Sequence, residues 1–321
     1  QKEIKDARLK LNGEDHSKTD VTEFNDLSIL PIPMLLDNYA YLIQDKQTNH
    51  SVLVDPGDPD KVLKINVIPD AILVTHKHWD HSGGNVKLKT AFPTVRIYGG
   101  AMDHIPCVTH AVADGDVIKF GELTFTVIYT PGHTVGHIVY LLDGSYFDAP
   151  ASLFSGDHLF ISGCGRMFEG TPTVMLRSLD KINNLKENTL VWPGIMKKLL
   201  NNHKIEKSYN PFLRTGEKSV LQSIGMITSS ETTEITDTMR MASITPKKIT
   251  YVPIYAKYGI FFYPDILQTH LFIFLIPSKK CFRILFVGGE KLIFSGSLSL
   301  VNVIFITDTS VQANIHCGSV W

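Results

Sequence analysis

The chain has 321 residues, of which 44% are hydrophobic and 20% are charged, and its formal net charge is −1 at pH 7. A balanced charge without a run of Lys or Arg argues against a nucleic-acid partner. Four widely spaced cysteines without a Cys-x-x-Cys pair exclude a disulfide framework and a thiolate zinc site. Residues 252–276 are apolar-rich but contain Lys257, Asp265 and His270, so we expect no transmembrane segment in this chain.

The N-terminal segment, residues 1–24, is polar and weakly patterned, and we expect a loose arm. The first residue is Gln1 rather than Met, which indicates an incomplete N-terminus, so a targeting segment is not observable.

A domain is predicted over residues 25–200, where short β-branched runs alternate with a helical pattern. Residues 71–75 form a continuous apolar run, which is typical of a strand buried on both faces. A helix is predicted over 172–185, with Thr171 as its N-cap and Pro172 at its first position. Strands mixed with helices favour sheets covered by helices. The predicted strands are 39–43, 51–54, 71–75, 95–98, 123–129, 137–142, 151–155 and 190–192.

The character of the sequence changes beyond about residue 200. Residues 219–248 are polar and rich in Thr, and residues 249–321 alternate apolar bursts with Ser, Gly and Lys turns. We leave 249–321 as an unassigned tail, either an added β-rich element or a poorly ordered segment.

The chemistry of the chain is concentrated in Thr75-His76-Lys77-His78-Trp79-Asp80-His81. A metal hydrolase needs converging ligands and an open coordination position for water. In an extended segment, His76 and His78 project to the same side because side chains alternate with period two. Asp80 and His81 follow where the chain turns and can face a neighbouring metal. Three histidines and an aspartate within six positions favour a metal site over an ordinary polar loop.

Two further groups complete the predicted site. His133 follows Pro131-Gly132, which presents it from a loop at a strand end. Asp157 follows the apolar run 151–155, a position suited to bridging two metals.

Other polar residues have competing interpretations. Asp55 either orients a ligand histidine or caps the turn after 51–54. For His137 a structural hydrogen bond is favoured over metal ligation. We interpret His104 and His110 as surface residues and Cys164 as a packed small residue.

These motifs resemble the glyoxalase II (hydroxyacylglutathione hydrolase) branch of the metallo-β-lactamase superfamily. The resemblance covers about residues 29–194 and returns at 209–214. It implies an α/β, four-layer αββα sandwich with a shortened C-terminal helical region, in which 201–248 is a remnant of the glyoxalase II-type C-terminal region. The motifs that carry it are 34–39, 75–85, 139–144, 153–157, 162–166 and 168–170.

The resemblance also implies the ligand set and the reaction. His76, His78 and His133 would hold one divalent metal, and Asp80 and His81 a second, with Asp157 bridging. Zinc is expected, with iron or manganese as alternatives. The reaction would be hydrolysis of a glutathione thioester, typically S-lactoylglutathione, with Asp80 orienting the attacking water. The expected partner is therefore a small glutathione conjugate, and the expected compartment is the cytoplasm or the mitochondrion.

Two segments depart from this pattern. The last metal histidine of the family follows Pro-Gly, as in P-G-H-E-Y, where this chain has Pro193-Gly194-Ile195-Met196-Lys197. That ligand and a glutathione-contacting tyrosine are missing, so we expect a weakened second metal site. Replacement of the missing ligand by His203 is the less favoured alternative. In the predicted substrate loop, Arg166 stands where glyoxalase II has Lys, and Phe168 where it has Tyr.

Two alternatives stay open at this point. The first is a mononuclear iron persulfide dioxygenase, whose two-His-one-carboxylate triad would be His76, His133 and Asp157. The second is a catalytically silent binding or regulatory protein with the same fold.

Overall fold

The computed structural model describes residues 2–12, 14–195, 201–228 and 234–244, together with four short strands in the tail. The chain divides into two compact units, Gln1–Pro246 and Lys247–Trp321. In the second unit, β16 (His270–Leu271) pairs with β19 (Ile306–Thr307), and β17 (Phe282–Leu285) pairs with β18 (Ile293–Gly296). The question of order in the rest of the tail lies outside the described residues.

The first unit contains a seven-stranded sheet that holds four of the predicted strands. Its strands run antiparallel from β1 to β4 and parallel from β4 to β7. The predictions at 39–43, 51–54, 71–75 and 95–98 are confirmed as β3 to β6. In spatial order the strands are β1 (Thr22–Phe24), β2 (Leu27–Met34), β3 (Asn38–Asp45), β4 (His50–Val54), β5 (Ala71–Val74), β6 (Arg96–Gly100) and β7 (His110–Val112).

A six-stranded sheet faces the first one and contains the other four predicted strands. Its pairings are antiparallel except for the parallel pair β11 and β14. Its strands, in spatial order, are β15 (Asn201–Asn202), β14 (Leu190–Pro193), β11 (Ser152–Gly156), β10 (Ile138–Leu142), β9 (Leu123–Tyr129) and β8 (Val117–Phe120).

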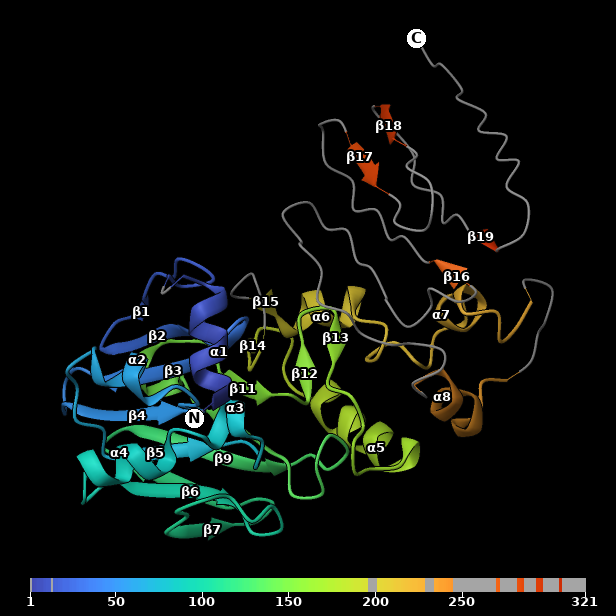
Figure 1. Cartoon of the computed structure of the whole chain (residues 1–321). Coiled ribbons are helices and arrows are strands. Elements are labelled where there is room, and N and C mark those ends of the chain that lie inside the picture. Colours follow the sequence, from blue (N-terminus) through green and yellow to red (C-terminus); the bar gives the residue numbers. More distant parts are fainter. Residues whose placement is uncertain are drawn as a thin grey trace. The chain divides into compact units, whose positions relative to one another are not determined.

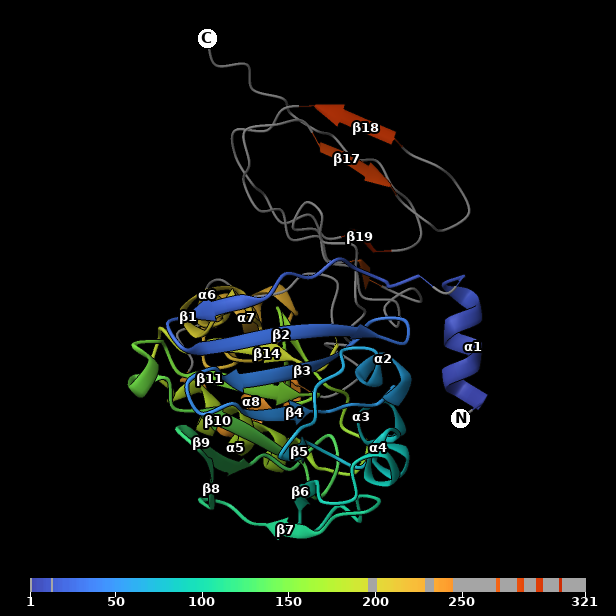
Figure 2. The ribbon, with the colours of Figure 1, turned by 90° about the vertical axis from the view of Figure 1, so that its left-hand side faces the viewer.

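Alternation along β3 explains how the layers stack. Ala40 and Leu42 belong to a core on the helix side of the first sheet, with Val62 of α2 (Pro59–Leu63) and Leu88 of α4 (Asn85–Ala91). The intervening Tyr41 points to the other sheet, where its ring contacts Phe154 and Trp192 at centroid distances of 5.4 and 5.6 Å. Strands with apolar side chains on both faces are thus buried between layers. Figures 1 and 2 show how the strands and helices of these layers are arranged.

Helices cover the second sheet as well. The helix predicted over 172–185 is α5 (Pro172–Asn183), and the Thr171 side chain caps it by accepting from the backbone N of Val174 at 3.3 Å. The region after β15 forms α6 (His203–Tyr209), α7 (Lys218–Ser223) and α8 (Asp237–Ser243). Arg240 of α8 pairs with Asp180 of α5. The expected four-layer architecture with a short C-terminal helical region is confirmed.

The N-terminal segment differs from the loose arm that its polar pattern predicts. Lys2–Lys10 form the helix α1, which buries Ile4 and Ala7 against the core beside α2. Nε of Arg8 donates to Oδ2 of Asp58 at 3.0 Å, and Asp58 is the N-cap of α2. The few apolar residues of the segment lie at helical spacing, and tertiary burial rather than intrinsic propensity stabilises so short a helix.

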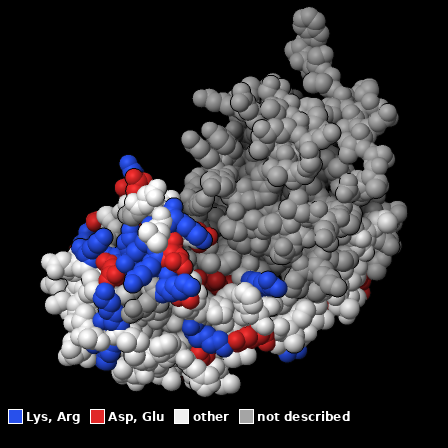
Figure 3. Space-filling model, in the orientation of Figure 1, with Lys and Arg blue, Asp and Glu red and all other residues white. Residues whose placement is uncertain are grey.

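Charged side chains of both signs are mixed on the surface around α1 and α2 (Figure 3). Asp60 pairs with Arg8 at 2.8 Å and also with Lys87, and Lys61 pairs with Asp15. Such exposed pairs contribute up to about 1 kcal/mol each.

Candidate metal centre

The histidine-rich segment leaves the carboxyl end of β5. His76 and His78 lie in the loop after the strand, and α3 (Trp79–Ser82) begins immediately afterwards and carries Asp80 and His81. His76 and His81 are buried, at 0% and 1% exposure. The carboxyl end of a parallel strand is where an α/β scaffold exposes reactive groups, so this backbone path brings four polar side chains to one place.

Three imidazole nitrogens converge beside this loop. Nε2 of His76 is 3.0 Å from Nδ1 of His78, and Nε2 of His133 is 2.9 Å from the same atom. Nitrogen ligands bound to zinc at about 2.0–2.1 Å in tetrahedral geometry are roughly 3.3 Å apart. Neutral imidazoles with lone pairs facing one another repel, whereas a cation between them is stabilised. These three residues, which the family resemblance implies as one ligand set, therefore fit a divalent metal.

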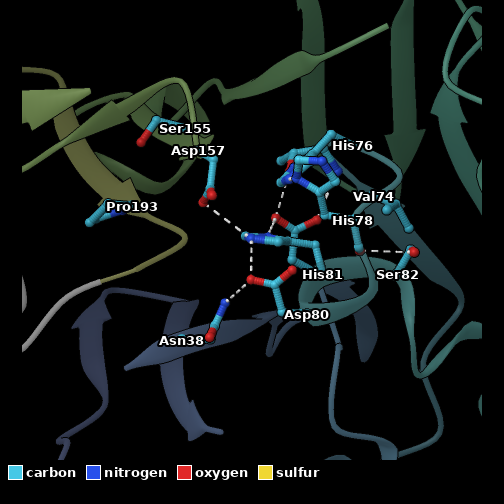
Figure 4. Close-up of polar contacts among 12 residues, drawn as sticks. Asn38, Val74, His76, His78, Asp80, His81, Ser82, Ser155, Asp157 and Pro193 are labelled. Carbon is cyan, nitrogen blue, oxygen red and sulfur yellow. Dashed lines mark hydrogen bonds and ion pairs between the residues drawn. The ribbon is translucent and has the colours of Figure 1, made fainter. Parts of the chain in front are cut away.

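A second group lies next to the first (Figure 4). Nε2 of His81 is 3.1 Å from Oδ1 of Asp157 and 3.5 Å from Oδ2 of Asp80. Oδ2 of Asp157 is 3.4 Å from Nε2 of His133, so this carboxylate faces both groups. His76, His81 and Asp157 also form a compact set of potential ligand atoms, all within 4.8 Å of one another.

The charges around His81 fit a bound cation. Nε2 of His81 and Oδ1 of Asp157 are buried and have no hydrogen-bond partner of good geometry. Burial acts to lower the pKa of His81, but Asp157, Asp80 and Asp55 outweigh it and raise the pKa well above its ordinary value. Three carboxylates around one buried imidazole favour positive charge at this position, which a divalent metal would supply. The donor set fits a dication.

The neutral state of His76 suits metal binding. Burial, followed by the neighbouring histidines, lowers the pKa of His76 well below its ordinary value. Its Nδ1 lies 3.0 Å from Oγ1 of Thr75, which leaves Nε2 directed at His78. A neutral imidazole with one nitrogen engaged presents the other as a ligand.

Asp55 orients a ligand histidine. Its carboxylate accepts from Nδ1 of His81 at 2.9 Å, and from the backbone N and Oγ1 of Thr75, both at 2.7 Å. Asp55 has a φ of 48°, in the left-handed region, where a non-glycine residue is strained. Of the two interpretations of this residue, the orienting role is the one that the contacts bear out.

Asn38 and Asp103 are two site residues that sequence reasoning missed. Nδ2 of Asn38 donates to Oδ2 of Asp80 at 2.9 Å. The buried carboxylate of Asp103 accepts from the backbone N of Lys77 at 2.6 Å and of Gly136 at 3.0 Å, and so ties the two histidine loops together. Asn38 belongs to a motif segment, which was a usable signal; Asp103 has no motif around it.

The predicted substrate residues lie on a loop at the rim of the site. The carbonyl oxygen of Arg166 accepts from Nδ1 of His133 at 2.7 Å. The Phe168 ring is 58% exposed and contacts the rings of His78 and His133, at centroid distances of 5.5 and 5.2 Å. The exposed Arg166 guanidinium lies over the Phe168 ring at 5.3 Å.

The end of β14 enters the site from the second sheet. Gly194 donates its N–H to the carbonyl oxygen of Gly156 at 2.9 Å, and its own carbonyl oxygen accepts from the backbone N of Tyr39 at 2.8 Å. A side chain at Gly194 would be excluded, because its Cβ would lie 2.6 Å from Cε1 of His81. Ile195 forms an antiparallel bridge with Asn38, so the residue at this position is adjacent to the contact that Asn38 makes with Asp80.

The remaining predictions have mixed outcomes. His137 makes a hydrogen bond with Oγ1 of Thr130 at 3.0 Å, as the structural interpretation expects, while its Nε2 is buried without a partner. His104 and His110 are exposed, and Cys164 is buried, with a pKa that burial raises.

His203 begins α6 and does not join the metal ligands. Burial lowers its pKa, and the other groups that influence it are Lys207, Glu187 and the backbone at 185–186. The suggestion that His203 replaces the missing ligand therefore has no support among its neighbours.

Comparison with known families matches residues 34–194 to the metallo-beta-lactamase superfamily. The chain belongs to this superfamily. Its fold implies binding of divalent metal, which agrees with the converging ligands described above. Among the described residues, no helix is long and apolar enough to cross a membrane.

Two curated relatives place the chain in the glyoxalase II branch. Hydroxyacylglutathione hydrolase of Trichormus variabilis is 43% identical over 172 residues, which are 52% of this chain and 67% of the relative. The cytoplasmic hydroxyacylglutathione hydrolase of Arabidopsis thaliana is 43% identical over 158 residues, which are 48% of this chain and 61% of the relative. The match thus spans about two thirds of the length of these relatives.

A solved structure supports the same fold. The crystal structure of ETHE1 from Myxococcus xanthus superposes with a TM-score of 0.50 at 27% identity, over 63% of this chain and 87% of that one.

Proposed function

We propose that this chain is a metal-dependent hydrolase of glutathione thioesters, converting substrates such as S-lactoylglutathione to the free acid and glutathione. The observation that carries the proposal is the convergence of Nε2 of His76, Nδ1 of His78 and Nε2 of His133 beside the His81–Asp157 pair. Relatives named hydroxyacylglutathione hydrolase support the thioester substrate.

The metal content follows from the donor set. His76, His78 and His133 would hold one divalent ion, and Asp80 and His81 a second, with Asp157 between them. Imidazole and carboxylate ligands suit zinc, with iron or manganese as alternatives. Bound there, the ions would polarise the thioester carbonyl and lower the pKa of the attacking water.

Asp80 is the proposed catalytic residue of the chain itself. Burial acts to raise the pKa of Asp80, but the charge of His81, followed by hydrogen bonds from His81 and Asn38, outweighs it and holds the pKa below its ordinary value. As a carboxylate, Asp80 would orient the attacking water and accept a hydrogen bond from it. Water adds to the thioester carbon, the C–S bond breaks, and the glutathione thiolate leaves. Because a thiolate is a good leaving group, no strong general acid is needed.

Arg166 and Phe168 are the proposed substrate-binding residues. The exposed guanidinium of Arg166 suits an anionic glutathione carboxylate, which an Arg can bind in bidentate fashion. The Phe168 ring, packed on His78 and His133, offers an apolar surface beside the reacting group without the hydroxyl of the tyrosine it replaces.

The second metal position is the weaker one, because Ile195 stands where the family has a ligand histidine. The backbone that would present such a ligand is nevertheless in place, since Ile195 bridges to Asn38 and Gly194 packs against His81. We therefore expect Ile195→His to strengthen the second metal position.

The test is metal stoichiometry and S-lactoylglutathione hydrolysis by the full chain and by Ile195→His, with Ile195→Asn as a polar control that adds no imidazole. The proposal predicts hydrolysis in the unchanged chain, and it predicts higher activity with fuller occupancy of the second metal position in Ile195→His but not in Ile195→Asn. One iron with oxygen consumption would instead support the persulfide dioxygenase. Bound metal without turnover of any thioester by either chain would support a silent binding protein.

We propose a cytoplasmic or mitochondrial location for this activity. Fractionation of cells that express the complete protein tests it, and secretion would contradict it.

A further inference from the structure

A buried polar cluster links α6 to the turn between β12 (Leu159–Phe160) and β13 (Gly163–Cys164). Glu206 of α6 and Asn210 at its C-terminal end are both 0% exposed. Oε2 of Glu206 accepts from the backbone N of Ser162 at 2.7 Å and from Nδ2 of Asn210 at 2.9 Å. Nδ2 of Asn210 also donates to the carbonyl oxygen of Gly163 at 2.9 Å. The cluster therefore holds the turn by hydrogen bonds to a backbone N–H and to a backbone carbonyl oxygen.

These hydrogen bonds stabilise an unfavourable backbone conformation, because Ser162 has a φ of 61°. A residue with a Cβ is disfavoured in the left-handed region, where glycine is not. The hydrogen bond that the N–H of Ser162 donates to the buried side chain of Glu206 stabilises this conformation of the turn. We therefore expect that loss of Glu206 destabilises the conformation of Ser162.

The chain that follows the turn packs on the metal ligands. At Gly165 a Cβ would lie 1.8 Å from the carbonyl oxygen of Asp157 and 3.0 Å from Nδ1 of His133, so this backbone leaves no room for a side chain. One residue later, the carbonyl oxygen of Arg166 accepts from Nδ1 of His133 at 2.7 Å. In the neutral imidazole, a proton on Nδ1 leaves Nε2 as the free nitrogen, and Nε2 of His133 faces Nδ1 of His78 at 2.9 Å.

We propose that Glu206 and Asn210 are positioning residues for the metal centre. By holding the β12–β13 turn, they keep the carbonyl oxygen of Arg166 on Nδ1 of His133 and so fix the tautomer in which Nε2 is the ligand. The inference rests on the metal-dependent function proposed above. It extends the site beyond residue 194, the last residue of the family match, into the C-terminal helical region. Partners that orient a ligand histidine typically change metal affinity about 10- to 100-fold.

Two variants and a rescue test the inference in the full chain. Glu206→Ala removes the acceptor, and Asn210→Asp replaces a donor with a carboxylate beside Glu206. We expect either change to lower Zn²⁺ affinity about 10- to 100-fold in competition with a chromophoric chelator. Adding Ser162→Gly to Glu206→Ala should restore most of the affinity, because glycine adopts the left-handed conformation without help. Ile29→Val, in the core of the first sheet, controls for general loss of stability.

Imidazole ¹⁵N NMR of the metal-free protein gives a readout that needs no turnover. The wild type should show His133 as a single Nδ1–H tautomer, and Glu206→Ala a mixture. If Glu206→Ala proves unfolded, Glu206→Gln, which keeps one accepting oxygen, is measured in the same way and should show a smaller loss. Wild-type tautomer and zinc affinity in a folded variant would overturn the inference, as would failure of Ser162→Gly to rescue. If the Glu206 variants change the His133 tautomer and the zinc affinity but the wild type hydrolyses no thioester, only the proposed function is overturned.

Discussion

Asn38 donates a hydrogen bond of 2.9 Å from Nδ2 to Oδ2 of Asp80, and its backbone pairs with Ile195 at the end of β14. One residue at the start of β3 thus joins a predicted ligand from the first sheet to the strand end that comes from the second sheet. The proposed second metal position therefore depends on this junction rather than on one contiguous motif.

Replacing Asn38 with Ala should therefore weaken the second metal position more than the first. We expect a fall in thioester hydrolysis of about 10- to 100-fold, the usual effect of losing a partner of a metal ligand. Stepwise zinc titration with activity at each step measures it. Asn183→Ala, which removes a 3.3 Å hydrogen bond to the carbonyl oxygen of Leu213, is the matched control. Equal behaviour of the two variants would contradict the role of Asn38.

Gly194→Ala should disrupt the centre although it changes no ligand. The new Cβ would lie 2.6 Å from Cε1 of His81 and 2.9 Å from Oδ1 of Asp157, so one of these ligands must move. Overpacking of this kind costs about 1–3 kcal/mol, and we expect loss of zinc affinity together with a lower Tm. At Gly216 the nearest neighbour of an added Cβ, Nε of Arg240, is 3.9 Å away, so Gly216→Ala should leave both quantities unchanged. Full zinc binding by Gly194→Ala would show that the strand end is not part of the site.

Arg166→Ala should raise KM for a glutathione thioester and leave kcat within about threefold, because uniform substrate binding is lost. The KM of the wild type should also rise with salt concentration, whereas that of the variant should rise less. Arg177→Ala, an exposed change on α5, is the control. An unchanged KM in Arg166→Ala, or an equal salt response in both proteins, would remove Arg166 from the substrate site.

Asp45 should make stability depend on acid pH. Burial acts to raise its pKa, but hydrogen bonds from Thr48, the backbone N of Glu122 and the backbone N of Gln47 outweigh it, and the pKa is lowered from 3.8. Because the folded pKa lies below the unfolded one, the stabilisation is present above about pH 4 and is lost as pH falls through the folded pKa. Glu122 belongs to the turn between β8 and β9, so the carboxylate of Asp45 also joins the two sheets.

Urea unfolding of Asp45→Asn at pH 7 should show a loss of about 1–3 kcal/mol, because buried N–H groups lose their charged acceptor. The difference in the free energy of unfolding between wild type and Asp45→Asn should become smaller towards pH 3. Asp26→Asn, on an exposed side chain just before β2, should show neither effect. A gap that stays constant from pH 7 to pH 3 would rule out the carboxylate as its source.

The sequence by itself predicted the central strands of both sheets, the helix α5 and the candidate metal ligands, because each depends on short-range patterns. It did not predict β1, β2, β7, β8 and β15. The apolar run 71–75 predicts a strand buried on two faces, and the spacing of His76 and His78 predicts ligands on one side of it. Local patterns also indicated His133 and Asp157, which come from two other loops, and the family resemblance then implied which metal each of these residues would hold.

Tertiary structure alone decided which polar groups support the ligands. Asp103 and Glu206 have no motif around them, and their roles appear only where distant backbone N–H groups meet a buried carboxylate. The helix α1 is likewise decided by burial against the core, since its own polar sequence predicts a loose arm. Burial and the pairing of hydrogen-bonding groups depend on contacts between segments far apart in the chain. A local sequence pattern does not predict these contacts.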